Sequence, residues 1–317
     1  MPGHSSPSEA VVICTRNRPG ELRQTLRSVA AQSGAEDRWV LVVDGSAPDE
    51  ADETAGAVSF WADRRPFRYH RYQGIPAQTR QRNAAIDLLP SSVEIVHFID
   101  DDVTLKPKYF DTLRETLCEN PVLLGAGGLI IESGRHGPSP LPSWPHRLFL
   151  LDAGTPGQVL PSGHTTPPRP LPNQEWRCAE WLSTCSSSYR RGVLRRHQFD
   201  PQVEGPSPTL HDLDFSFRVS REGPLALVPG AECVHRRSPK TRRRTREAST
   251  ERVARRYWFV EKNLGSGPHR LAFWWSMLGT LLILLVSSRR DRDEALCGFL
   301  RGLRTVWHRD HDLLRSG

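Results

Sequence analysis

The sequence has no pair of cysteines at the spacing of a zinc site or a redox motif. Its six cysteines stand singly, at positions 14, 118, 178, 185, 233 and 297. Scattered single cysteines, with Cys14 inside an apolar run, predict buried free thiols in a reducing cytosol. The N-terminus MPGHSSPSEA also lacks a basic region followed by an apolar one, so no secretory signal is expected.

Apolar residues are also somewhat scarce, at 37% of the chain, whereas 26 prolines and 24 glycines imply much loop. No internal repeat is present. The net charge of +7 favours anionic partners such as nucleotides, phospholipid surfaces or nucleic acid. Nucleic acid is the least favoured of these partners, because no known reader motif accompanies the charge.

The order of the apolar segments indicates an α/β fold. The 317 residues suffice for one large α/β domain with appended elements, or for two domains. The apolar run 11–14, a helical pattern at Leu22, Leu26 and Val29, and the run 39–43 read as strand, helix, strand, which predicts a parallel sheet. Further strands are expected at 68–72, 95–99, 122–131 and 226–228, and helices at 76–89, 107–119, 209–218 and 250–264.

Residues 133–173 are rich in proline, glycine, serine and histidine. They predict a long irregular insertion, which is either a mobile lid or a disordered spacer. Residues 1–10 are expected to be a flexible N-terminus and residues 11–236 one domain. Residues 237–317 are expected to form a basic loop followed by C-terminal helices that include the apolar segment 271–286.

The most informative feature is the triplet Asp100-Asp101-Asp102, which follows the apolar run 95–99. Clustered carboxylates at a strand end repel one another unless a cation offsets the repulsion. Mg²⁺ binds through one or two carboxylates together with substrate phosphates. Because side chains alternate along a strand, Asp100 and Asp102 are expected on one side and Asp101 on the other. The alternative is a solvated acidic turn.

Polar residues also follow two other strands, at Thr15–Arg18 and at Asp44. In open α/β sheets the ligand crevice lies beyond the carboxyl ends of the strands. The three polar strand ends are therefore expected to meet in one crevice.

With these motifs in view, the chain resembles a family 2 inverting glycosyltransferase of the nucleotide-sugar-binding GT-A fold. The resemblance covers about residues 10–236 and includes a DXD motif. It rests on VVICTRNRP (11–19), VLVVDGS (40–46), GIPAQTRQRNAAI (74–86), HFIDDDV (97–103), GAGGLI (125–130), WLSTCSSSYRR (181–191) and HDLDFSFR (211–218).

The resemblance implies roles for particular residues. Nucleotide-sugar binding is implied for Thr15, Arg16, Asn17, Arg18, Asp44, Arg82, Asn83, Asp100 and Asp101, and Mg²⁺ or Mn²⁺ ligation for Asp102 and His235. Asp212 would be the general base, and Trp181, His211 and Asp214 would contact the acceptor. His211 departs from the family pattern, which has glutamate there, so the acceptor geometry is in question.

These roles agree with the chemistry of sugar transfer. A metal at Asp102 and His235 would stabilise the charge that builds on the departing nucleoside diphosphate. A single displacement needs one base opposite the leaving group, which a carboxylate such as Asp212 can supply. Structural alternatives stay open: Thr209 and Asp212 fit a helix-capping box, and His235, Arg82 and Asp44 are also compatible with ordinary surface or turn roles.

The C-terminal part predicts membrane association. The stretch 271–286 is shorter than the ~20 apolar residues that span a bilayer. Trp274 and Trp275 near its start and arginines at both ends fit an interfacial helix on the cytoplasmic face of the cell membrane, beside a lipid-linked or glycan acceptor. A buried packing helix is the alternative.

Two other functions compete with glycosyl transfer. One is a nucleotidyltransferase, which would need a glycine-rich, lysine-bearing phosphate loop that TRNRPG (15–20) does not provide. The other is a membrane-bound scaffold of the same fold that has lost activity.

Overall fold

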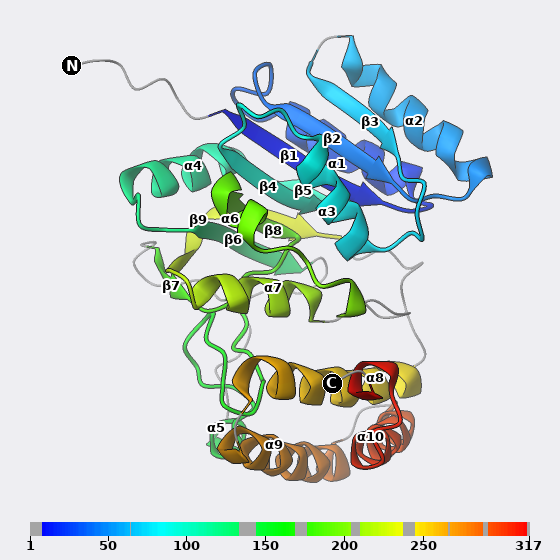
Figure 1. Ribbon diagram of the computed structural model, residues 1–317, viewed down its shortest axis with the longest axis vertical. Helices are drawn as coiled ribbons and strands as arrows, with labels where there is room; N and C mark the ends of the chain where they lie inside the picture. The colour runs from blue at the N-terminus through cyan, green and yellow to red at the C-terminus, as the bar shows by residue number, and fades with distance from the viewer. Residues whose placement is uncertain are drawn as a thin grey trace.

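The computed structural model describes residues 8–63, 65–132, 144–168, 176–203, 210–236, 245–265, 267–287 and 291–315. In this part of the chain a mixed β-sheet carries helices on both faces, and a further layer of helices lies beyond one of them (Figure 1). The expected α/β class is confirmed, and the C-terminal residues do form helices.

The sheet runs in the order β3-β2-β1-β4-β8-β6-β9-β5, and β7 pairs with β9. Strands β3, β2, β1 and β4 are parallel, whereas β8 is antiparallel to β4. Every residue of β1 is buried, as befits a central strand with helices on both sides. The strands are β1 (Glu9–Thr15), β2 (Trp39–Asp44), β3 (Phe67–Arg71), β4 (Ile95–Asp100), β5 (Val103–Leu105), β6 (Gly125–Glu132), β7 (Arg177–Ala179), β8 (Ser186–Arg190) and β9 (Leu225–His235).

Two apolar cores cover the two faces of the sheet. One face packs against α1 (Pro19–Ala30), α2 (Pro48–Ala62) and α4 (Tyr109–Glu119). The other face packs against α3 (Gln78–Leu88), α6 (Arg191–Arg196) and α7 (His211–Ser220). The helical spacing of Leu22, Leu26 and Val29 explains the first of these contacts, since all three side chains are buried.

Helix α7 is apolar on two sides. Phe215 and Val219 face the sheet, while Leu213 and Phe217 belong to a third core with the C-terminal helices. Figure 1 shows α7 between the sheet and this last layer. The layer contains α8 (Thr245–Phe259), the π-helical turn η3 (Val260–Leu264), α9 (Gly267–Val286), α10 (Arg292–Trp307) and α11 (Asp312–Arg315).

The region expected to be an irregular insertion is partly built into the fold. It contains α5 (Trp144–Leu148) and a bridge between Val159 and Thr165. Ser162 and Thr166 are fully buried, so residues 144–168 pack as structure and are no disordered spacer. The rest of the insertion, the basic run 237–244 and residues 1–7 lie outside the described residues. The short helix η1 (Pro201–Val203) precedes another such gap.

Candidate active site

The polar strand ends do meet at one edge of the sheet. In the β1–β2 pair Thr15 lies beside Asp44, and in the β1–β4 pair Cys14 lies beside Asp100. The parallel register therefore brings the 15–18 loop, Asp44 and the aspartate triplet together. The predicted meeting of the three polar strand ends at one edge of the sheet is confirmed.

Two aspartates of the triplet and one histidine form a cluster that could hold a metal ion. One ligand atom from each of Asp100, Asp102 and His235 lies within 4.8 Å of the others. His235 reaches the cluster because the end of β9 pairs with β5, where it lies beside Val103. His235 Nε2 is 3.1 Å from Asp102 Oδ1, and this hydrogen bond raises the pKa of the imidazole, against the opposing effect of burial.

The expected strand alternation does not separate Asp101 from Asp102, because β4 ends at Asp100 and both residues lie in the turn that follows. Arg18 Nη1 lies near both carboxylates, at 3.6 Å from Asp102 Oδ2. The Asp101 carboxylate accepts hydrogen bonds from Thr15 Oγ1 at 2.7 Å and from Arg18 at 2.8 Å. Burial raises the pKa of Asp101 to about 7, although Arg18 and Thr15 oppose the rise. Only 4% of Asp101 is exposed. The residue holds the 15–18 loop against the triplet, and the expected contact of Asp101 with the nucleotide sugar stays a prediction.

Asp44 also has internal partners. It is completely buried, and its carboxylate accepts hydrogen bonds from the Ser46 main chain at 2.8 Å, from Tyr69 Oη at 2.8 Å and from Arg71 at 3.2 Å. Burial and the Asp44 charge raise the pKa of Tyr69 to about 12. Asp44 thus fixes the conformation of the chain at the end of β2, with Tyr69 and Arg71 of β3 as its side-chain partners.

The loop after β1 is shaped by Asn17, whose backbone is left-handed with a φ of 57°. The Asn17 main chain donates to Ser46 Oγ at 2.7 Å, and its side chain accepts from Ala47 N at 2.8 Å. Asn17 therefore links the loop to the end of β2. Arg16 is exposed, in a position that leaves its guanidinium accessible to a ligand.

Arg82 is the buried cation of the site. Its side chain is 3% exposed and its Nη2 lies 3.0 Å from Asp100. Its Nη1 is buried and has no hydrogen-bond partner among the described residues. A buried unpaired donor costs about 1–3 kcal/mol unless a ligand satisfies it. Its neighbour Asn83 instead exchanges two hydrogen bonds with the main chain of Phe199, at 2.8 and 2.9 Å.

Asp212 lies in the first turn of α7. Its carboxylate accepts the Leu213 main-chain N–H at 2.8 Å. Burial raises the pKa of Asp212, while the Leu213 N–H, the Arg82 charge and Ser183 oppose the rise. Asp212 is thus near Arg82, which in turn contacts Asp100. The side-chain cap expected from Thr209 lies outside the described residues.

The three residues expected at the acceptor contact different parts of the protein. His211 is buried and contacts Thr184 Oγ1 at 3.2 Å. The Trp181 indole donates to Thr166 O at 3.3 Å. Asp214 has no exposed surface, and it contacts Lys262 at 2.8 Å and Arg218 at 3.1 Å. Asp214 ties α7 to the C-terminal helices through Lys262, and the expected contact with an acceptor stays a prediction.

One residue of the site was missed in the sequence. Arg236 donates its main-chain N–H to Asp102 O at 2.9 Å, and its guanidinium donates to Glu21 O at 2.9 Å and Thr25 Oγ1 at 3.0 Å. It therefore fastens the end of β9 to α1 behind the triplet. Its position next to the candidate ligand His235 could have indicated a role in the site. In the sequence, however, Arg236 was grouped with the basic run that follows it.

Comparison with known proteins identifies a family. Residues 10–166 match the model of the family described as glycosyl transferase family 2. No curated protein matches the chain.

Solved structures also match, at low identity. Staphylococcus aureus TarS 1–349 in complex with UDP-GlcNAc is 13% identical with a TM-score of 0.57, and the match covers 98% of this chain and 90% of that one. The mannosyltransferase PcManGT from Pyrobaculum calidifontis, in complex with GDP-Man and Mn²⁺, is 12% identical with a TM-score of 0.59, covering 97% and 89%. At such identities the likeness shows a shared GT-A fold, while the family match shows the glycosyltransferase class.

Proposed function

We propose, from the premise that this chain belongs to glycosyl transferase family 2, that it is a metal-dependent inverting enzyme. It would move a sugar from a nucleoside diphosphate sugar to a hydroxyl acceptor. The observation that carries the proposal is the arrangement around Arg82, which contacts Asp100 of the candidate metal cluster and lies near the carboxylate of Asp212.

The residues of the cluster fit Mn²⁺ or Mg²⁺. Two carboxylates and an imidazole suit Mn²⁺, and the carboxylates alone suit Mg²⁺. Asp100, Asp102 and His235 would hold the ion, which when bound supplies positive charge to the diphosphate leaving group. The free Nη1 of Arg82 supports the same role, because a phosphate oxygen would satisfy this buried donor.

Asp212 would accept the proton of the acceptor hydroxyl. Burial raises its pKa, so its carboxylate is a stronger base than an exposed aspartate. The site offers one such carboxylate beside Arg82, and a single base without a covalent nucleophile suits a single displacement with inversion. Binding of UDP-GlcNAc and GDP-Man by the similar structures supports a nucleoside diphosphate sugar as the donor class.

The first experiment is calorimetric titration of the full chain with UDP, dTDP and GDP, each with and without Mn²⁺. We expect one nucleotide to bind, with an affinity that falls at least tenfold without the metal. Arg82→Gln should weaken this binding, while Arg68→Gln, an exposed arginine on β3, is the matched control. Failure of all three nucleotides to bind folded protein would contradict the proposal.

We further propose that the enzyme acts peripherally on the cytoplasmic face of the cell membrane, on a lipid-linked or glycan acceptor of polysaccharide, cell-wall or glycolipid assembly. Among the described residues α9 is the one helix long and apolar enough to cross a membrane, a test that core helices of soluble proteins also pass. Its residues Phe273, Ser276, Met277 and Gly279 are buried against the protein. Because one side of α9 packs against the protein along its length, we expect the helix to lie in the membrane interface and not to span the bilayer.

The outer side of α9 supports a lipid contact. Leu271, Leu278, Leu282 and Leu285 are 44–73% exposed and follow one side of the helix. In the first half of the helix the Trp275 indole donates to the Leu148 carbonyl of α5. Arg147 and Arg270, which are exposed near this half of α9, would add about 1 kcal/mol each on an anionic surface.

Sedimentation with vesicles tests this placement. The full chain should pellet with phosphatidylglycerol-containing vesicles and less with phosphatidylcholine alone. The variant Leu278→Glu/Leu282→Glu should remain in the supernatant. Phe60→Glu is the control, since Phe60 is 65% exposed on α2, at the opposite end of the molecule (Figure 1). Equal pelleting of all three proteins would refute the docking face.

A further inference from the structure

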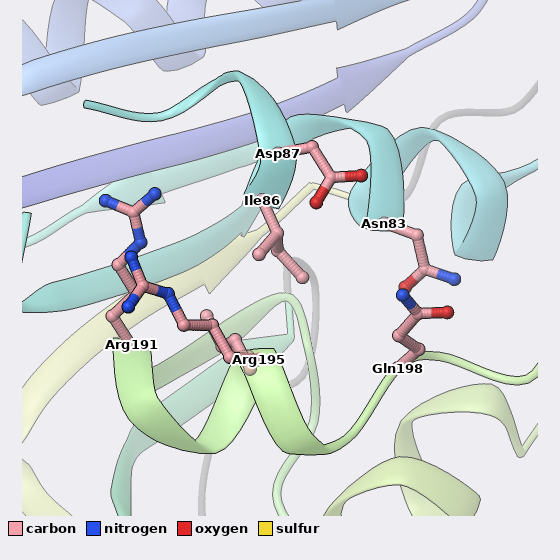
Figure 2. A pocket seen from close by; sticks show the side chains of 7 residues that line it. Asn83, Ile86, Asp87, Arg191, Arg195 and Gln198 are labelled. Atoms are coloured by element: carbon pink, nitrogen blue, oxygen red, sulfur yellow. The ribbon is translucent and has the colours of Figure 1, made fainter. Parts of the chain in front are cut away.

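A cavity of about 290 Å³ lies between α3 and α6, beside the candidate active site (Figure 2). Among the described residues that line it, Asn83 is the one expected to bind the nucleotide sugar. One wall comes from Arg191 and Arg195, and the opposite wall from Asn83, Asp87 and Gln198. A volume of this size is at the small end of known ligand sites and suits a ligand of about one sugar unit. None of the groups that hold the candidate metal lines it.

The wall formed by α6 is cationic, and its two arginines form no ion pair among the described residues. The terminal nitrogens of Arg191 donate to the Leu89 and Pro90 carbonyls, but its Nε is buried and unpaired among the described residues. Figure 2 shows the side chains of Arg191 and Arg195 next to each other at this wall. Burial and the charge of Arg195 lower the pKa of Arg191. Neither one pairs with a carboxylate in the described part of the chain.

Arg196, the residue after Arg195 on α6, does have a counter-charge. Arg196 forms an ion pair with Glu222, and His197 contacts the same carboxylate at 2.6 Å. Glu222 thus neutralises the outer side of α6, whereas the side that faces the cavity keeps two adjacent cations. An anionic group of a ligand would reduce their repulsion and accept hydrogen bonds from both.

The opposite wall has different chemistry. Asn83 is held in place by its two bonds to Phe199, and the amide of Gln198 and the carboxylate of Asp87 lie beside it. Amides and a carboxylate bind hydroxyl groups well, and Asp87 disfavours a ligand that is anionic at both ends. Ile86 and Leu194 give the cavity an apolar surface between the two walls.

We propose that this cavity binds an anionic saccharide unit, a sugar or polyol that carries a phosphate or a carboxylate. The anionic group would lie against Arg191 and Arg195, and the hydroxyl groups against Asn83, Asp87 and Gln198. The cavity is thus a second carbohydrate site, separate from the donor site. The same chemistry could come from a free sugar phosphate or from one unit of an anionic glycan chain.

Titration calorimetry of the full chain tests the proposal, with glucose 6-phosphate, glucose and inorganic phosphate as probes. Glucose 6-phosphate should bind at least tenfold more tightly than either of the others. Arg195→Gln should weaken it at least tenfold, because the charged contact is lost, while Arg196→Gln should leave it unchanged. Asp87→Asn should weaken glucose 6-phosphate but not inorganic phosphate.

Three results would overturn the inference: equal binding of inorganic phosphate and glucose 6-phosphate, equal effects of the two arginine variants, or competition by saturating nucleotide with Mn²⁺. The last would place the ligand in the donor site. Because no turnover is measured, an inactive enzyme would not affect the outcome. A tri-galacturonate that binds more tightly than galacturonate would identify a glycan chain as the source, and equal binding a single unit.

Discussion

Replacement of Asp212 by asparagine separates the chemical role of α7 from its structural role. Asparagine has the same shape and can still accept the Leu213 N–H, which the carboxylate accepts at 2.8 Å. It cannot take up a proton. Loss of a general base lowers turnover by about 10²–10⁴-fold, so we expect Asp212→Asn to lose at least 100-fold in kcat with an unchanged melting temperature.

Asp214, two residues further along α7, supplies the matched control. It is fully buried, and asparagine there would leave Arg218 without its counter-charge and Lys262 with Asp200 alone. Breaking a buried ion pair costs about 3–5 kcal/mol. Both cations are partly exposed, so we expect about 2 kcal/mol and a drop of about 4–8 °C in Tm. At temperatures where it stays folded, Asp214→Asn should keep its kcat within about threefold.

The assay is release of nucleoside diphosphate with whichever donor the binding experiment identifies, together with thermal unfolding of each variant. Binding of nucleotide and Mn²⁺ should be equal in wild type and Asp212→Asn, because the base acts on the acceptor. Since the pKa of Asp212 is raised, the acidic limb of the wild-type pH profile should lie above the ordinary aspartate range. Turnover of Asp212→Asn within threefold of wild type would refute the assignment of Asp212 as the general base.

Three other results follow from the structure. Mn²⁺ binding should release protons near pH 7, because a cation at the cluster lowers both the pKa of Asp101, about 7, and the raised pKa of His235. Calorimetric titrations in buffers of different ionisation enthalpy would show this release. Identical heats in all buffers would contradict it. Asp102→Asn should abolish stimulation by Mn²⁺, measured against a chelator-treated wild type, whereas retained stimulation would exclude this ligand. Burial would raise the pKa of Glu9, but His97 and Arg38 outweigh this effect and lower the pKa to about 2. The ionised Glu9 carboxylate should therefore stabilise the fold by about 3 kcal/mol above pH 4.5. This stabilisation should be lost as the pH falls towards 2. Urea unfolding of Glu9→Gln should show this loss, with less than about 0.5 kcal/mol for the exposed Glu53→Gln.

The sheet could be predicted because its signals are local. Strand β1 is an uninterrupted apolar run, and α1 has its leucines at helical spacing, so period and burial agree. Helix α2 escaped notice because small residues such as Ala51 and Ala57 form its buried side. The packing of residues 144–168 could not be foreseen either, since Ser162 and Thr166 are buried by tertiary contacts that composition does not reveal.

The site was predictable in its location and only partly in its contacts. Parallel strands place Thr15, Asp44 and Asp100 at one edge, whatever the details. Whether a carboxylate faces a ligand or the protein depends on partners far away in the sequence. Asp44 meets Tyr69 and Arg71, and Asp214 meets Lys262, so both are internal groups.

Helix α7 connects the proposed membrane face to the proposed general base. Its Leu213 and Phe217 pack on the C-terminal helices, and Asp214 joins it to η3, while Asp212 on the same helix faces Arg82. Removing residues 266–317 would uncover the apolar side shared by α8 and α7, so lost activity in a truncated chain would say nothing about lipid. The outer leucines of α9 make no such contact with α7, because they are exposed. Substitutions at Leu278 and Leu282 therefore separate docking from catalysis: if they abolish vesicle binding but preserve turnover on a soluble acceptor, the membrane face serves only to bring the enzyme to its acceptor.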